Sequence, residues 1–229
     1  MRSDRIRWGV MSLVGACALA LAVAPARAQD PVKVAGDHYK VISENDSVRV
    51  LDATLAPGAK AAMHSHPDLE VVVLEGGAVK WTFADGKSRL SGPEMKRGAV
   101  LFMKGEAHSA ENLGKTTVHV VLVEFKKPAP EAAKGRSPSL PMPYKQLADD
   151  THARVFELTA LPGGKVSEHT HGDHVIVSLS DSTADVTDKD GKKETMSFKK
   201  DTALVGGPVT HSGVNTGKTP LSLIVVEVK

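Results

Sequence analysis

Short apolar stretches rich in valine and leucine alternate with turn residues along most of the chain. Stretches of this length indicate β-strands, and the pair Asp85-Gly86 is typical of a hairpin turn. No helical period extends beyond two turns, so the pattern predicts an all-β fold. In the first half, the expected strands are Val48–Leu55, Glu70–Leu74, Val79–Phe83, Ala99–Met103 and Val118–Phe125.

The same pattern occurs twice. An offset of 105 positions places Tyr39 on Tyr144, and a later offset of 103 places His108 on His211. A repeat of this length indicates a duplicated domain, because solenoid repeats are only about 20–50 residues long. We therefore expect two tandem antiparallel jelly-roll β-barrels, at residues 37–126 and 144–229. The proline-rich segment 127–143 predicts a semi-rigid linker between them.

Residues 1–28 predict a secretory signal peptide that is no part of the fold. A basic start precedes an apolar run from Gly9 to Ala24, and Ala26-Arg27-Ala28 is a cleavage signal before Gln29. The run is too short for a good membrane anchor. We expect the mature chain to be exported, either periplasmic or secreted, with no membrane attachment after cleavage.

Charge and cysteine content narrow the possible partners and ligands. The whole chain has a formal charge of +2, but residues 1–28 carry four arginines and one aspartate, which leaves −1 for the mature part. Nothing global then favours a nucleic-acid partner. Cys17, the only cysteine, also lies in the signal. A metal in the mature chain would therefore be held by histidine and carboxylate.

His64, His66, Glu70 and His108 form a candidate metal site in the first copy. Side chains on a strand alternate between its faces, so we expect His64 and His66 to share one face and Glu70 to repeat it. His108 arrives from a distant strand. Three imidazoles and a carboxylate suit a divalent metal (Fe, Mn, Zn, Ni or Cu), with positions left open for water or substrate.

These residues resemble the motifs of the cupin superfamily. The first motif, G-x5-H-x-H-x3/4-E-x6-G, is matched at every spacing by Gly58, His64, His66, Glu70 and Gly77. The second motif is matched by Gly98, His108 and Asn112, while Lys104 stands in place of its proline. The resemblance implies a two-domain bicupin whose barrels pair within one chain. It does not specify the reaction, because cupins include dioxygenases, isomerases, decarboxylases, sugar-binding modules and storage proteins.

The second copy retains His169, His171 and His211, but Val175 stands where the first copy has Glu70. His174 falls one residue earlier, and on a regular strand it would point away from His171. A bulge at Gly172-Asp173 would instead turn it inward and complete an all-histidine site. Both arrangements are compatible with the sequence, as is a second copy that has lost its metal.

Glu124 and Glu227 recur at equivalent strand ends, where an ion pair or a strand-end hydrogen bond explains them as well as a catalytic role does.

The function that these observations favour is a metal-dependent, oxygenase-type enzyme acting on a small organic molecule. Glu70 would serve as a ligand or shuttle a proton. Isomerase or lyase chemistry would use the same ligands. The alternatives outside catalysis are an exported protein that holds a metal or a small ligand without turnover, and a stress or assembly protein whose paired barrels only stabilise each other.

Overall fold

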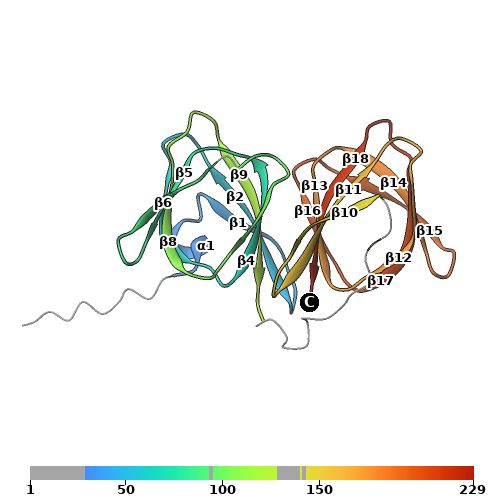
Figure 1. Ribbon diagram of the computed structural model, residues 1–229, viewed down its shortest axis with the longest axis horizontal. Coiled ribbons are helices and arrows are strands. Elements are labelled where there is room, and N and C mark those ends of the chain that lie inside the picture. Colours follow the sequence, from blue (N-terminus) through green and yellow to red (C-terminus); the bar gives the residue numbers. More distant parts are fainter. Residues whose placement is uncertain (1–28, 93–94, 128–139, 141–142) are drawn as a thin grey trace, which may run out of the picture.

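The computed structural model describes residues 29–92, 95–127, 140 and 143–229, which form two antiparallel β-barrels side by side (Figure 1). The all-β, double jelly-roll fold expected from the sequence is confirmed. The predicted signal peptide and most of the predicted linker lie outside the described residues. Among the residues described, no helix is both long and apolar enough to span a bilayer.

The first barrel consists of two sheets with strand orders β1-β2-β9-β4-β7 and β3-β8-β5-β6. A short helix, α1, precedes them, and Asp30 caps it by accepting a hydrogen bond from the backbone N–H of Val32. The bounds are α1 Pro31–Val34, β1 Tyr39–Glu44, β2 Val48–Leu55, β3 Lys60–Ser65, β4 Leu69–Glu75, β5 Val79–Phe83, β6 Ser88–Leu90, β7 Val100–Met103, β8 Ala107–Asn112 and β9 Val118–Phe125.

The second barrel repeats this arrangement, with strand orders β10-β11-β18-β13-β16 and β12-β17-β14-β15. The bounds are β10 Tyr144–Asp149, β11 Ala153–Ala160, β12 Lys165–His171, β13 His174–Ser178, β14 Ser182–Asp188, β15 Lys193–Phe198, β16 Ala203–Gly206, β17 Val209–Asn215 and β18 Leu221–Val228. Even the register shift in the first strand pair recurs, between Val41 and Ser43 and between Gln146 and Ala148.

The two barrels pack together through the outer faces of their five-stranded sheets. Because side chains alternate along a strand, Leu122 of β9 faces into its barrel while Val121 and Val123 face the other barrel. The buried residues of this seam come from both barrels: Val48, Val50, Val72, Leu74, Val121, Val123, Phe125, Ala153, Val155, Val175, Val177, Ile224 and Val226. These sheets are therefore buried on both faces, which explains their continuous runs of apolar residues.

Polar contacts at one end of the seam follow the same internal symmetry. Nε2 of His152 lies 2.9 Å from Oδ2 of Asp68, and the hydroxyl of Ser47 donates to Oδ2 of Asp173 at 3.0 Å. Ser47 and His152 are equivalent in the repeat, as are Asp68 and Asp173. The ring of His152 also stacks on Phe125, with centroids 4.8 Å apart.

Candidate metal centres

In the first barrel, three histidines come together from two paired strands. His64 on β3 lies opposite His108 on β8, and His66 follows directly after β3. One nitrogen of each ring lies within 4.8 Å of the other two, and all three side chains are buried. The structure thus brings together the three imidazoles expected from the sequence.

Hydrogen bonds to the outer nitrogens fix how two of these rings point. Nδ1–H of His64 donates to the carbonyl oxygen of Ala62 at 2.6 Å, and Nδ1–H of His66 donates to Oε1 of Glu124 at 2.5 Å. Nε2 of each ring then carries no proton, and its lone pair can bind a metal ion. Nε2 of His64 is buried and has no hydrogen-bond partner among the described residues, which is costly unless an ion or a ligand meets it.

Burial keeps His64 and His108 neutral. It lowers the pKa of His64 to about 4 and the pKa of His108 to about 3, and the charge that neighbouring imidazoles would carry acts in the same direction. A divalent metal binds the neutral ring. The nitrogen that lacks a partner, the fixed ring orientations and the neutral donors together fit such an ion.

Glu70 does not join this group, which corrects its sequence-based placement. The chain turns at Pro67-Asp68, and β4 then begins with Leu69 facing into the barrel. Glu70 therefore lies on the same face of β4 as Val72, the face that packs against the second barrel. It is completely buried there, with Asp150 of the second barrel beside it. Burial, helped by Asp150, raises the pKa of Glu70 to about 9. At this position it is neither a ligand nor a proton shuttle for the three histidines.

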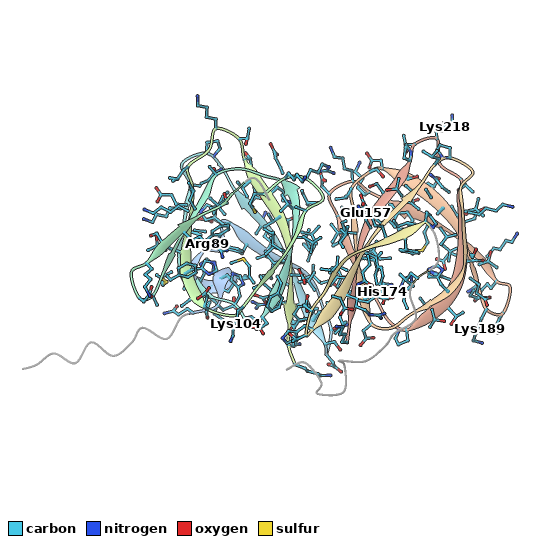
Figure 2. The ribbon with its side chains drawn as sticks, viewed as in Figure 1. Arg89, Lys104, Glu157, His174, Lys189 and Lys218 are labelled. Atoms are coloured by element: carbon cyan, nitrogen blue, oxygen red, sulfur yellow. The ribbon has the colours of Figure 1, made fainter. Side chains whose placement is uncertain are left out.

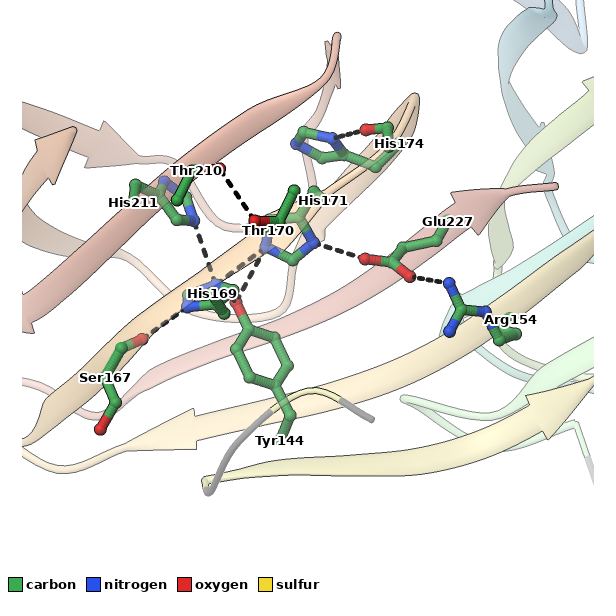
Figure 3. Close-up of polar contacts among 11 residues, drawn as sticks. Tyr144, Arg154, Ser167, His169, Thr170, His171, His174, Thr210, His211 and Glu227 are labelled. Atoms are coloured by element: carbon green, nitrogen blue, oxygen red, sulfur yellow. Dashed lines mark hydrogen bonds and ion pairs between the residues drawn. The ribbon is translucent and has the colours of Figure 1, made fainter. Parts of the chain in front are cut away.

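In the second barrel, His169, His171 and His211 form the equivalent group (Figure 3). Nε2 of His169 lies 3.0 Å from Nε2 of His171 and 3.1 Å from Nε2 of His211. Two nitrogens bonded to one ion at about 2.1 Å are roughly 3.0 Å apart when they occupy neighbouring octahedral positions. The spacing of these nitrogens therefore also fits a shared metal ion.

His174 lies within the second barrel (Figure 2), beside this group. Its ring is buried, with its centroid 4.8 Å from that of His171. The chain turns at Gly172-Asp173 between β12 and β13, so the alternation of β12 does not continue across it. His174 takes the inward position that Leu69 has in the first barrel, but the group of nitrogens within 4.8 Å of one another consists of His169, His171 and His211.

The carboxylates that orient the imidazoles are functional residues that sequence reasoning left unassigned. Glu227 accepts a hydrogen bond from Nδ1–H of His171 at 2.7 Å, as Glu124 does from His66. Each is held by an arginine: Nε of Arg49 lies 2.6 Å from Glu124, and Nη2 of Arg154 lies 2.7 Å from Glu227. The available signal was the repeat itself, because both arginines and both glutamates align between the copies.

A small, almost wholly apolar cavity adjoins each centre. The first has a volume of about 60 Å³ and is lined by His66, His108, Leu69, Trp81 and Met103, among others. The second has a volume of about 50 Å³ and lies beside His169, His171 and His211. Such a cavity excludes bulk water from the exposed face of a bound ion.

Neither a protein-family model nor a curated protein sequence matches the chain. Solved structures do match it. One is a cupin 2 conserved barrel domain protein from Leptotrichia buccalis, with a TM-score of 0.52 and 14% identity over 83% of this chain and 88% of that one.

Two enzymes of known structure are also similar. Salicylate 1,2-dioxygenase from Pseudoaminobacter salicylatoxidans has a TM-score of 0.55 at 13% identity, over 81% of this chain and 70% of that one. Oxalate decarboxylase from Lactobacillus farciminis has a TM-score of 0.55 at 16% identity, over 80% of this chain and 77% of that one. At these identities the likeness shows the fold: the chain has the cupin fold, in two tandem domains.

Proposed function

We propose that this protein is an exported, metal-dependent enzyme that acts on a small organic molecule at the first centre, by an oxygenase-type reaction. The observation that supports it most is the set of three buried imidazoles, two of them oriented by hydrogen bonds, beside an apolar cavity. Two enzymes that share its fold are described with small organic acids: salicylate 1,2-dioxygenase with gentisate, and oxalate decarboxylase with formate.

The residues at the first centre would have separate roles in metal binding and catalysis. His64, His66 and His108 hold the ion, and Glu124 keeps His66 in the tautomer that binds it. When bound, a divalent metal supplies a Lewis acid that can hold and polarise an oxygen-bearing substrate. The apolar wall formed by Leu69, among others, excludes water, so that charge on the substrate interacts strongly with the centre.

The size of the cavity limits the substrate. One ordered water needs about 10–15 Å³, so the cavity of about 60 Å³ holds a few waters or a molecule of similar size. Short carboxylic acids such as oxalate fit this limit better than an aromatic ring such as gentisate. The buried phenol of Tyr39, packed on His64 with centroids 4.9 Å apart, supplies a polar group next to the ligands at this cavity.

The experiment that tests the proposal uses the purified full chain loaded with Fe(II) or Mn(II). Oxalate and gentisate serve as probes, with oxygen uptake and product formation as readouts. We expect turnover of oxalate that His64→Ala abolishes. His119→Ala is the matched control, because His119 pairs with Asp52 outside both centres and should leave turnover unchanged. Turnover that survives His64→Ala would contradict the assigned centre.

A protein that holds metal without turnover is the second candidate. It is favoured by the second centre, where His174 occupies an inward position that is apolar in the first barrel. An additional imidazole bound to that ion would leave fewer open positions for a substrate. Zinc or copper bound tightly at both centres, with no turnover of either probe, would favour this candidate. Isomerase or lyase chemistry at the first centre would give product without oxygen uptake.

Export is part of the proposal and has its own test. Residues 1–28 have the sequence of a cleaved signal. Mass spectrometry of the protein recovered from a bacterial periplasm should show a chain that begins at Gln29. A cytoplasmic protein that retains Met1 would contradict export without affecting the metal centres.

A further inference from the structure

The phenol of Tyr144 faces the second centre. Tyr144 is the first residue of β10, and its hydroxyl oxygen lies 3.2 Å from Nε2 of His169 and 3.5 Å from Nε2 of His171. Figure 3 shows the ring reaching the three histidines from the side opposite His174. The hydroxyl is thus almost as close to the two imidazole nitrogens as those nitrogens are to each other, at 3.0 Å.

A bound metal changes what this hydroxyl can do. Without an ion, it donates a hydrogen bond to the lone pair on Nε2 of His169. An ion that binds the three imidazoles takes those lone pairs, and the hydroxyl then has no acceptor on the rings. The hydroxyl oxygen then faces the ion. Its distances of 3.2 Å and 3.5 Å from Nε2 of His169 and His171 suit a further ligand of the same metal.

The donor set of the second centre points the same way. The histidine side chains carry no negative charge, and the carboxylate of Glu227 is engaged on the outer side of His171 by its hydrogen bond with Nδ1–H. Among the described residues that line this pocket, Tyr144 is the one weak acid. The Tyr144 hydroxyl is therefore the oxygen that reaches the imidazole nitrogens of this centre.

We propose that the phenol oxygen of Tyr144 is a ligand of the metal at the second centre, alongside His169, His171 and His211. On binding, its O–H bond breaks and the proton leaves to solvent, so the ligand is a phenolate. This inference rests on the proposed metal site. It makes the second centre chemically different from the first, with three nitrogens and one oxygen as donors and His174 as a further imidazole beside them.

The first barrel provides the matched control. The ring of Tyr39 lies 4.9 Å from His64 and 5.8 Å from His66 by centroids, and the ring of Tyr144 lies 5.1 Å from His169 and 5.9 Å from His171. Among the described residues, however, the Tyr39 hydroxyl makes no hydrogen bond with an imidazole. Tyr39→Phe therefore removes a comparable buried hydroxyl without removing a proposed ligand.

The test is visible spectroscopy of the full chain loaded with copper(II), with copper measured by elemental analysis in the same samples. Coordination of phenolate to copper(II) produces a charge-transfer band in the visible range that imidazole ligands do not. We expect this band in the wild type and in Tyr39→Phe. Tyr144→Phe should lack it while retaining copper at both centres, because three imidazoles remain at the second.

His211→Ala identifies the copper of the second centre, since it removes one of that centre's three imidazoles. A band that persists in Tyr144→Phe would overturn the inference. So would a wild type that shows no band although His211→Ala lowers its copper content. A wild type in which His211→Ala changes neither band nor copper content would overturn the second metal site together with the inference, which distinguishes that failure from the others.

Discussion

Glu124 accepts a hydrogen bond from Nδ1–H of His66 across 2.5 Å, with both side chains buried. Nε of Arg49 holds the same carboxylate from the other side at 2.6 Å. We call this chain of contacts, from arginine through glutamate to histidine, the relay. The second barrel repeats it with Arg154, Glu227 and His171. A carboxylate in this position keeps the ring in one tautomer and increases the basicity of its other nitrogen, so the relay prepares His66 and His171 as metal ligands.

Glu124→Gln should therefore weaken metal binding at the first centre. Loss of such a partner typically costs about 10–100-fold in metal affinity, and we expect a decrease in that range. Metal titration of the full chain measures it. Glu227→Gln is the matched control: it should weaken the second centre and leave the first unchanged. Equal affinities of wild type and Glu124→Gln would contradict the role of the relay.

Gly206→Ala tests the position of His174. Gly206 lies opposite His174 across the β13–β16 pair, and a Cβ there would lie 2.5 Å from Cε1 and from Nε2 of His174. The ring must move, so the metal affinity of the second centre should fall while that of the first stays constant. A Cβ at Gly207 meets nothing within 4 Å, so Gly207→Ala serves as control. A second centre unaffected by Gly206→Ala would exclude His174 as a ligand.

The buried carboxyl of Glu70 should make stability depend on pH. Burial, with Asp150 beside it, raises the pKa of Glu70 from 4.5 to about 9 in the folded protein. The protonated form is thus favoured by folding, and its contribution is complete below pH 4.5 and is lost as pH rises toward 9. The pKa of Asp150 is lowered from 3.8, so its effect falls at lower pH.

We expect Glu70→Gln to be more stable than the wild type at pH 8, by a margin that shrinks toward pH 5. About 1 kcal/mol shifts Tm by roughly 2–4 °C in a chain of this size, so the gap at pH 8 should be at least a few degrees. Glu75→Gln, at the exposed end of the same strand, should have no effect. Parallel Tm profiles of wild type and Glu70→Gln would contradict this account of Glu70.

Ile224→Ala tests the seam between the barrels. Ile224 is completely buried among residues of both barrels. Removing such a side chain typically costs about 2–5 kcal/mol, because the cavity left behind collapses only partly. Denaturant unfolding should show a loss in this range, and Leu204→Ala, at a position 43% exposed, should cost much less. A loss below about 1 kcal/mol for Ile224→Ala would show that the seam contributes little.

Much of the fold was predictable from the sequence, because apolar alternation and the internal repeat are both local patterns. Tyr39 and Tyr144, for example, begin equivalent strands that a fixed offset superimposes. Three histidines of each centre were also predictable, since His64 and His66 are two residues apart and His108 follows a recognisable motif. Alternation within one strand determines such relationships without knowledge of the tertiary structure.

The rest depended on turns and on contacts between distant segments. Because the chain turns at Pro67-Asp68, Leu69 and not Glu70 faces into the first barrel. The spacing of the residues alone does not reveal which alternate residues of β4 face inward. The role of Glu124 required knowing that the end of β9 lies beside His66. The proximity of Asp150 to Glu70 required the packing of the two barrels, which no pattern within one barrel specifies.

The central claim is that each barrel gathers three imidazoles around one metal ion. Anomalous X-ray scattering from crystals of the metal-loaded full chain, recorded at the absorption edge of the metal, tests it most directly. The account predicts two peaks per chain, one among His64, His66 and His108 and one among His169, His171 and His211. A metal-loaded crystal with no peak at either group of histidines would contradict it.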